Sequence, residues 1–281
     1  MARTNMAAAR LKPETSQLIT LRVLRRERVS PGFVRVTLGG GDIAGFVPMG
    51  FDQWFRLFIP VREAGELTRL PNRLTTASYL RYLAIAKTQR PVLRNYTVRS
   101  YRPDGPQGPE LDVDLVIHGS VVDGTAGPAS LWAQTCAVGD SVAVLDEGVT
   151  FNPPPGTERL LVVADETGLP AVAGILASLP RDAVGTVLVE VPGDDDRQEL
   201  DAPAGVDVAW VRRATPEAVP GATVLVAVEQ GAADPGGVPA ARCYGWVVGE
   251  QALASGTRRH WVGAGVPKEN ILFAGYWRSH A

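Results

Sequence analysis

The run Arg94-Asn95-Tyr96-Thr97-Val98-Arg99 combines an arginine, an aromatic ring and a hydroxyl within one predicted strand. Because successive side chains of a strand point to opposite faces, Arg94 and Tyr96 share one face and Asn95 and Thr97 share the other. These groups suit a ligand with a diphosphate, a flat ring and a hydrogen-bonding ring nitrogen, which describes flavin adenine dinucleotide (FAD). The alternative is an ordinary strand rich in Tyr, Thr and Val, and the run taken alone favours that alternative.

A second candidate is Gly127-Pro128-Ala129-Ser130, which opens a predicted helix soon after the strand Leu111–His118. Proline suits the first helical turn, where its missing N–H costs nothing. A helix start also leaves backbone N–H groups unpaired and carries a partial positive charge, so it suits a phosphate. The alternative is a plain capped helix with Trp132 packed in the core. The position just after a strand that ends in His118-Gly119 favours the phosphate site.

A third candidate is the turn Asp165-Glu166-Thr167-Gly168-Leu169-Pro170-Ala171, which follows the buried strand Leu160–Ala164. It lacks the G-x-G-x-x-G fingerprint, which argues against a standard Rossmann dehydrogenase. A turn of the Thr-Gly-x-Pro type still lets the backbone approach a nicotinamide nucleotide. Glu190 ends the next strand, where it either accepts a ribose hydroxyl or is a solvent-facing charge beside Asp194-Asp195-Asp196.

Two further positions place an arginine in apolar or aromatic surroundings. Arg56 is the one charge in the apolar strand Gln53–Pro60, where it either lines a ligand cleft or is simply solvated. The last motif of the chain, Gly275-Tyr276-Trp277-Arg278, follows a predicted strand. Its two rings either cap the core or cover a planar cofactor, in which case the arginine attracts an anionic ligand.

The first half of the chain has the pattern of an antiparallel β-barrel. Alternating side chains and turn signals predict six strands between residues 17 and 150, and a short helix is predicted over Thr76–Ala86 within a long excursion, residues 61–90. The expected strands are Gln17–Arg28, Phe33–Leu38, Gln53–Pro60, Arg94–Arg99, Leu111–His118 and Ser141–Leu145. We expect this barrel to bind FAD.

The proline-rich stretch 151–156 is the best domain boundary, because the pattern changes after it. Continuous apolar strands joined by helices predict a parallel sheet with helices on both faces over residues 157–281. The expected strands are Leu160–Ala164, Thr186–Val191, Val206–Val211, Ala222–Val228, Cys243–Gly249 and Ile271–Ala274. Such sheets bind ligands at the carboxyl ends of their strands, and we expect a nicotinamide nucleotide there.

The composition excludes several classes of function. The 281 residues are 45 % hydrophobic and 21 % charged with a net charge of −2, so no nucleic-acid partner is expected. Two cysteines and three scattered histidines offer no metal site, and redox chemistry here must therefore use an organic cofactor. No run is long enough to span a membrane. We expect a cytoplasmic monomer whose residues 1–16 form a disordered tail.

Taken together, the four blocks resemble the ferredoxin-reductase superfamily, and more closely the siderophore-interacting proteins, which are flavin-dependent ferric-siderophore reductases. The blocks are Arg94–Arg99, Val116–Gly119 with Gly127–Ala133, Asp165–Ala171, and Gly275–Arg278. They occur in this order and span nearly the whole chain after residue 17. Each block is weakly specific by itself, whereas the set is specific.

The resemblance implies a role for each block. Arg94 would bind the FAD diphosphate, Tyr96 would pack along the flavin and Thr97 would lie near flavin N5, where it is the best single candidate for a catalytic, positioning role. The cofactor site would be completed by Asn95, His118, Gly119, Gly127, Pro128, Ala129, Ser130, Tyr276 and Trp277. Asp165, Glu166 and Thr167 would border the nicotinamide nucleotide. Arg56 and Arg278 match two basic residues that attract an anionic ferric siderophore, and a third basic residue is not found.

The implied activity passes electrons from NADH or NADPH through FAD to Fe(III) in a ferric siderophore, which releases Fe(II). Glu190 favours NADH, whereas Arg212 and Arg213 could hold the 2′-phosphate of NADPH. Gly168 and Ser279 depart from the residues expected in their blocks, which leaves the siderophore class open. The alternatives are a flavin reductase with another electron acceptor and a non-catalytic flavin- or siderophore-binding module.

Overall fold

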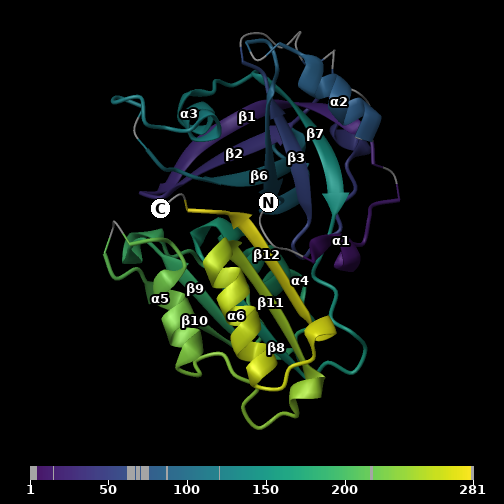
Figure 1. Ribbon diagram of the computed structural model, residues 1–281. Helices are drawn as coiled ribbons and strands as arrows, with labels where there is room; N and C mark the ends of the chain where they lie inside the picture. The colour runs from purple at the N-terminus through teal and green to yellow at the C-terminus, as the bar shows by residue number, and fades with distance from the viewer. Residues whose placement is uncertain are drawn as a thin grey trace. The chain divides into compact units, whose positions relative to one another are not determined.

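The computed structural model describes residues 5–14, 16–61, 67, 70, 76–86, 88–119, 121–215 and 218–279. The chain forms two compact units (Figure 1). The barrel unit comprises Lys12–Met49 and Gln53–Gly148, and the α/β unit comprises Val149–Ala281 with Gly50–Asp52 and Met1–Leu11.

The barrel unit is built on one antiparallel sheet of seven strands in the order β4-β3-β7-β1-β2-β6-β5. The strands are β1 (Leu18–Ser30), β2 (Phe33–Gly39), β3 (Trp54–Ile59), β4 (Val92–Thr97), β5 (Ser100–Gly105), β6 (Gly108–Val116) and β7 (Ser141–Gly148). Around it lie the helices α2 (Thr76–Ala84) and α3 (Pro128–Thr135) and the short 3-10 turn η1 (Ile43–Gly45). The predicted antiparallel barrel class is confirmed.

The strand that carries the Arg94 motif explains why seven strands form instead of the predicted six. β4 lies at one edge of the sheet and β5 at the other, yet Val98 and Arg99 alone separate them in the chain. At this corner the Val98 N–H donates to the carbonyl of Gln53 beside β3, and the Arg99 N–H donates to the carbonyl of Asp112 on β6. The chain therefore passes from one edge of the sheet to the other, and the sheet must curl until its edges meet.

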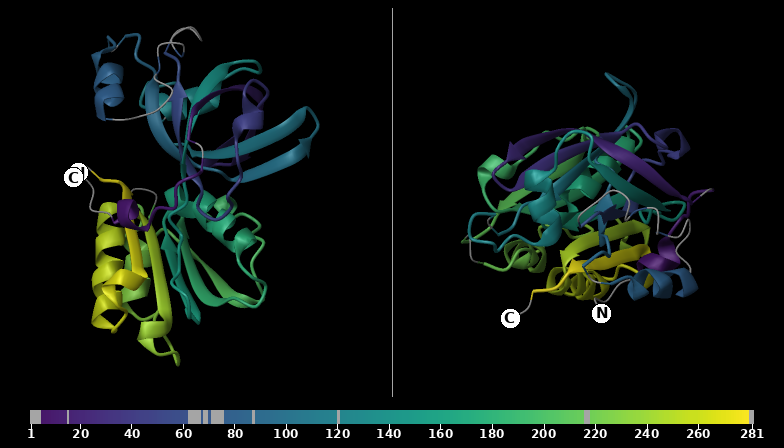
Figure 2. Two further views of the ribbon diagram at one scale, coloured as in Figure 1. Left: turned by 90° about the vertical axis from the view of Figure 1, so that its right-hand side faces the viewer. Right: turned by 90° about the horizontal axis from the view of Figure 1, so that it is seen from above.

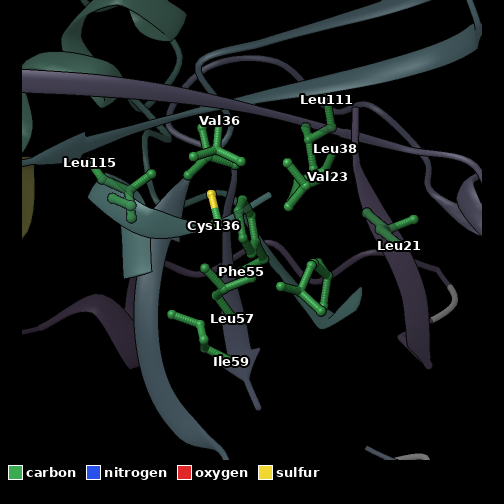
Figure 3. Packing of buried hydrophobic residues seen from close by; sticks show 14 of the residues in the cluster. Leu21, Val23, Val36, Leu38, Phe55, Leu57, Ile59, Leu111, Leu115 and Cys136 are labelled. Atoms are coloured by element: carbon green, nitrogen blue, oxygen red, sulfur yellow. The ribbon is translucent and has the colours of Figure 1, made fainter. Parts of the chain in front are cut away.

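Inward-facing apolar residues of these strands form the barrel core, as the alternating pattern predicts. Figure 3 shows side chains from β1, β2, β3 and β6 converging around Cys136, which is buried as a free thiol. A second cluster on the other face of the sheet joins Phe58 to Tyr82 of α2, whose rings meet edge-on with centroids 5.8 Å apart. This cluster holds α2 against β3 and β7.

The α/β unit contains a parallel sheet in the order β10-β9-β8-β11-β12. Its elements are β8 (Arg159–Ala164), α4 (Leu169–Ser178), β9 (Val184–Val191), β10 (Gly205–Arg212), α5 (Ala222–Glu229), β11 (Cys243–Glu250), α6 (Gln251–Gly263) and β12 (Ile271–Trp277), with 3-10 turns η3 (Glu166–Gly168), η4 (Asp194–Asp196), η5 (Ala240–Arg242) and η6 (Lys268–Asn270). α5 and α6 cover one face and α4 covers the other (Figures 1 and 2). The predicted parallel sheet with helices on both faces is confirmed.

The prediction of a strand over Ala222–Val228 is wrong, because these residues form helix α5. The run is continuously apolar and rich in valine, a pattern that fits a buried strand as well as one face of a short buried helix. Helix formation is favoured by Gly221, whose φ of 86° turns the chain into the helix. It is also favoured by the Glu190 carboxylate, which accepts hydrogen bonds from the N–H groups of Gly221 (2.9 Å) and Val224 (3.0 Å).

The prediction of a disordered tail over residues 1–16 fails where the structure describes that segment. Helix α1 (Met6–Ala9) forms there, and the side-chain amide of Asn5 donates to the carbonyl of Ile271. The Asn5 carbonyl oxygen in turn accepts from the N–H of Phe273, so this segment is hydrogen-bonded along β12. Within the described residues, none of the helices is long and apolar enough to cross a membrane.

Candidate cofactor and nucleotide sites

Strand β4 presents the Arg94 motif as the alternation predicts. Arg94 is exposed and donates to the carbonyl of its neighbour Leu93, whereas Tyr96 is half-buried against the barrel core. Thr97 is buried at the end of the strand. Burial raises the pKa of Tyr96 to about 12, so its phenol stays neutral and can donate a hydrogen bond at physiological pH. A charge, a neutral ring and a hydroxyl therefore follow one another along an edge strand.

Trp54 is a further candidate residue for this site, which sequence reasoning missed. It lies directly opposite Thr97 in the β3–β4 pair, which brings their side chains to the same face. The indole N–H of Trp54 is buried, and it has no hydrogen-bond partner among the described residues. A buried donor without a partner is costly, which makes Trp54 a candidate ligand-binding residue. The one signal in the sequence is that Trp54 and Arg56 alternate onto the same face of β3.

The helix start of α3 is built as an anion site would be. Gly127 is the N-cap and Pro128 follows in the first turn, and no side chain among the described residues caps this end. The Ser130 hydroxyl donates to the carbonyl of His118 (3.0 Å) and accepts from the His118 N–H (3.3 Å). Ser130 thus fixes the loop after β6 against α3.

Two glycines let the loop approach the helix closely. Gly119 has a φ of +70°, and a Cβ on it would lie 2.4 Å from the carbonyl oxygen of Thr125. A Cβ on Gly127 would lie 3.3 Å from Nε2 of His118, so the imidazole sits beside the helix start. Gly119 therefore accepts a side chain poorly, whereas a Cβ at Gly127 would require only a small shift of the His118 imidazole.

The structure brings the β4 motif and the α3 motif together. Arg94 and Pro128 line the same hollow, which has a volume of about 420 Å³. Residues 34 positions apart in the sequence therefore border one space, as a dinucleotide site requires. Arg56 lies elsewhere, on β3 opposite Asn95, where its Nε is 2.6 Å from a carboxylate oxygen of Glu147. Arg56 is thus an ion-paired residue and not a simply solvated one.

In the α/β unit, Asp165 is a fully buried hub at the end of β8. Its carboxylate accepts hydrogen bonds from the N–H of Glu250 (2.7 Å), the indole of Trp277 (3.2 Å) and the N–H and hydroxyl of Thr167. Burial raises the pKa of Asp165. Gly249 makes room for this carboxylate, because a Cβ there would lie within 2.8 Å of it. Asp165 therefore joins the carboxyl ends of β8, β11 and β12.

Glu166, the neighbour of Asp165, belongs to a buried cluster with Arg213 and Glu190. Arg213 is ion-paired with Glu166, and its Nε lies 3.0 Å from the Glu190 carboxylate. Burial and the nearby charge of Asp165 raise the pKa of Glu166 to about 7, against the opposing effect of Arg213. The carboxylate of Glu166 is thus held inside the unit at the point where β8 leads into η3.

Both sequence interpretations of Glu190 are wrong. The side chain is fully buried, so it is neither a solvent-facing charge nor open to a ribose hydroxyl, and it caps α5 instead. Arg213 is likewise removed as a candidate for the 2′-phosphate of NADPH, because both of its buried acidic partners occupy it. Arg212 remains exposed, 3.9 Å from an Asp194 carboxylate oxygen.

The final motif lies on β12 and just beyond it. Tyr276 is 36 % exposed and Arg278 is exposed, whereas Trp277 is anchored through its indole to Asp165. Ser279 then donates its N–H to the Glu250 carboxylate, which also caps helix α6. The predicted residues of this unit, from Asp165 to Thr167 and from Tyr276 to Arg278, therefore gather at the carboxyl ends of the parallel strands.

Comparison with known families identifies the class of protein that these features define. Residues 22–150 match the model of the siderophore-interacting FAD-binding domain, and residues 157–280 match the model of the siderophore-interacting protein. The chain belongs to the siderophore-interacting protein family. The predicted family and the predicted FAD-binding barrel are both confirmed.

Named relatives agree with this assignment. The chain is 31 % identical over 210 residues to the ferric vibriobactin reductase ViuB of Vibrio cholerae, and this match covers 74 % of this chain and 70 % of ViuB. It is 28 % identical to the NADPH-dependent ferric-chelate reductase of Escherichia coli, over 92 % of both chains. An uncharacterized protein of Mycobacterium tuberculosis is 35 % identical over 68 % of this chain, and the match spans 64 % of that relative.

Among solved structures, a siderophore utilization protein from T. fusca superposes with a TM-score of 0.72. It is 31 % identical, and the match covers 97 % of each chain. The likeness extends over both units, and the ferredoxin-reductase-like two-domain fold is confirmed.

Proposed function

We propose that this protein reduces ferric siderophores, passing electrons from NADH or NADPH through FAD to Fe(III) so that the iron is released as Fe(II). The observation that carries the proposal is the pairing of the β4 motif with the α3 helix start on one hollow, with the unpartnered indole N–H of Trp54 opposite Thr97. The membership of the siderophore-interacting protein family supports it.

The residues of the barrel unit fit FAD. Arg94 and the N–H groups at the start of α3 would hold the diphosphate, while Tyr96, Thr97 and Trp54 would orient the flavin ring by packing and hydrogen bonding. Asn95, His118, Gly119 and the Gly127–Ser130 turn would complete the site. Bound FAD supplies the conversion of a two-electron donor into single electrons, and the protein supplies position and electrostatics.

For the nucleotide, we infer that Asp165, Glu166 and Thr167 border the nicotinamide site at the carboxyl end of β8, with Tyr276 and Trp277 as its aromatic cover. Their position at the ends of β8 and β12 supports this. The name of the Escherichia coli relative supports NADPH as a donor. Exposed Arg212 is the candidate for the 2′-phosphate, since Arg213 is occupied by Glu166 and Glu190.

For the substrate, we infer that Arg56 and Arg278 attract an anionic ferric complex. Oxygen-rich siderophores hold hard Fe(III) far better than Fe(II), so reduction frees the metal without breaking the ligand. The nicotinamide donor and the released iron are both used inside the cell, and we therefore propose that the protein acts in the cytoplasm. We also propose that it is a monomer. Light scattering of the purified full-length chain checks the oligomeric state.

The test is the flavin absorption band of FAD-loaded protein under anaerobic conditions. NADH or NADPH should bleach the band, and a ferric hydroxamate or catecholate should restore it with release of chelatable Fe(II). Bleaching without recovery would refute the siderophore as acceptor and support a different electron acceptor. Retained flavin that neither nucleotide reduces would support a binding module instead.

Thr97 is proposed as the positioning residue for the flavin ring. Thr97→Ala should slow bleaching by the nucleotide while FAD stays bound, because the hydroxyl lies on the face that Trp54 and Arg56 share. Thr97→Ser keeps the hydroxyl and should restore the rate. Unchanged reduction kinetics in Thr97→Ala would refute this role.

A further inference from the structure

The carboxyl ends of the parallel strands hold more buried acid than buried base. Four acidic side chains of this region are at most 5 % exposed: Asp165, Glu166, Glu190 and Glu250. Among the buried residues that the structure describes in the α/β unit, Arg213 is the single basic one. The nicotinamide nucleotide is proposed to bind at this same edge of the sheet, so the imbalance of charge bears on its chemistry.

Three of these carboxylates are compensated by the start of a helix or 3-10 turn. Asp165 caps η3 and Glu250 caps α6. Glu190 accepts hydrogen bonds from two N–H groups at the start of α5. The partial positive charge of a helix start stabilises a carboxylate placed there. Glu166 depends instead on Arg213, which it shares with Glu190.

Glu166 is therefore the carboxylate with the weakest compensation. Its neighbour Asp165 accepts four hydrogen bonds, which favour the ionised form of Asp165. When Asp165, Glu166 and Glu190 are all ionised, their three negative charges face the one positive charge of the guanidinium. Burial and the charge of Asp165 raise the pKa of Glu166 to about 7, against the effect of Arg213. Glu166 thus holds the proton that reduces the imbalance.

The other groups packed around Glu166 leave this negative charge in place. Helix α4 contains no titratable side chain. On β12, burial and the charges of Asp52 and Asp165 raise the pKa of Tyr276, so its phenol is neutral at physiological pH. Asp52 is itself buried and accepts a hydrogen bond from the indole of Trp246 (3.3 Å). The region is therefore negative near pH 7, and the protonation of Glu166 varies its charge.

A nicotinamide ring changes its charge in the proposed reaction. The reduced ring is neutral, and it becomes a cation when a hydride leaves it with two electrons. A negative charge fixed in a water-poor site stabilises a cation far more than the same charge does in water. The buried carboxylates at this edge of the sheet therefore favour the oxidised ring.

We propose that Glu166, beside Asp165 and paired with Arg213, makes the nicotinamide site favour the oxidised, cationic nucleotide over the reduced one, and that Glu166 releases its proton to solvent when the cation binds. The inference rests on the proposed function, because it takes the carboxyl end of β8 as the nicotinamide site. The same charge stabilises the cation that forms as the hydride leaves, so ionised Glu166 assists hydride donation.

The test is isothermal titration calorimetry of the FAD-loaded, full-length protein with two ligands. One is NADP+, and the other is tetrahydro-NADP, whose ring is neutral and cannot donate a hydride; NAD+ and tetrahydro-NAD replace them if NADH is the better donor. Between about pH 5.5 and about pH 8, the ratio of affinities should shift towards the oxidised nucleotide by roughly five- to tenfold. Both ligands carry the same phosphates and adenine, so the titration of those groups cancels in the ratio.

A second measurement counts protons and needs no variant. At about pH 6.5, titrations in two buffers of different ionisation enthalpy should show release of about half a proton with the oxidised nucleotide and none with the neutral analogue. The cation lowers the pKa of Glu166 and the neutral ring does not.

The variant Glu166→Gln removes the charge and keeps a side chain of the same shape beside Arg213. Its affinity ratio should not change with pH, and it should release no proton. Glu229→Gln is the matched control, because Glu229 is an exposed glutamate at the far end of α5 in the same unit. This variant should behave as the unmodified chain does.

The outcomes separate this inference from the proposed function. If neither nucleotide binds, the proposed nicotinamide site fails and the inference fails with it. If both bind, with one ratio at both pH values and no proton release, the reductase proposal stands and the inference is refuted. If Glu166→Gln matches the unmodified chain in ratio and proton release, another group carries the proton and the assignment to Glu166 is wrong.

Discussion

In the barrel unit, Arg94 is exposed on an edge strand, and its guanidinium donates a hydrogen bond to the carbonyl of its neighbour Leu93. At the carboxyl ends of the parallel strands, by contrast, Arg213 is 8 % exposed and lies between two buried carboxylates, Glu166 and Glu190. Arg94 lies on a strand and Arg213 directly follows one, so the sequence alone predicts phosphate binding equally well for both. The difference is that the charge of Arg213 is neutralised by buried carboxylates, whereas the side chain of Arg94 is exposed to solvent.

This contrast distinguishes charged residues that stabilise the fold through buried ion pairs from charged residues that are exposed and could bind a ligand. Taking two carboxylates out of water is costly, and Arg213 offsets that cost by pairing with both. The result is a rigid junction between β9, η3 and the start of α5. An exposed arginine on an edge strand contributes little to stability, so its position there is free to suit a ligand.

The largest expected effect is on stability. Arg213→Ala leaves Glu166 and Glu190 buried without their counter-ion and should lower the free energy of unfolding by roughly 3 to 5 kcal/mol. Arg94→Ala should change it by about 0.5 kcal/mol or less. Urea unfolding of the flavin-free chain, followed by the fluorescence of buried Trp246 and Trp261, measures both. If Arg213→Ala lowered the free energy of unfolding by less than about 1 kcal/mol, the proposed difference between Arg213 and Arg94 would be refuted.

The next effect is on the cofactor. Arg94→Ala should weaken FAD binding by about 10- to 100-fold, the equivalent of one charge-assisted hydrogen bond to phosphate. Arg22→Ala is the matched control, because Arg22 is an exposed arginine of the same sheet that donates to the carbonyl of Gly139. Fluorescence titration with FAD measures both variants. Equal affinities for FAD would show that Arg94 is not a phosphate ligand.

A third prediction concerns pH. The pKa of Glu166 is raised to about 7 in the folded chain from an ordinary value near 4.5, so the folded state binds the proton more tightly. The resulting stabilisation is present below pH 4.5 and is lost as the pH rises through 7. The unmodified chain should therefore lose roughly 2 to 3 kcal/mol between pH 4.5 and 7.5 relative to Glu166→Gln. Parallel curves of unfolding free energy against pH would contradict this.

The smallest effect concerns substrate attraction. Arg56→Ala and Arg278→Ala should each raise KM for an anionic ferric chelate several-fold, while stability changes by less than about 1 kcal/mol. Glu147→Gln should do the reverse and lower KM, because it removes the carboxylate that neutralises Arg56. Steady-state kinetics with an anionic and a neutral ferric complex measure this. The same KM changes for the neutral complex would refute an electrostatic role.

Much of the barrel could be predicted because its signal is local. Leu111, Val113 and Leu115 alternate with charged residues, and the structure places all three in the core. Trp54 was not predicted as a candidate site residue, because what makes it one is its position opposite Thr97, a residue 43 positions away. The seventh strand was missed for a similar reason, because the corner at Val98 and Arg99 is defined by the backbone of Gln53, just before β3, and of Asp112 on β6.

The sequence by itself indicated most of the strands and helices and the position of the four motifs, because period-2 alternation and apolar runs depend on neighbours along the chain. It missed β5 and mistook helix α5 for a strand. Only the tertiary structure decided which charges remain available. Arg213 meets Glu190 across 23 residues and Glu166 across 47, and Glu190 reaches over 31 residues to cap α5. Whether a charge is free depends on partners that folding brings together, and no spacing in the sequence records them.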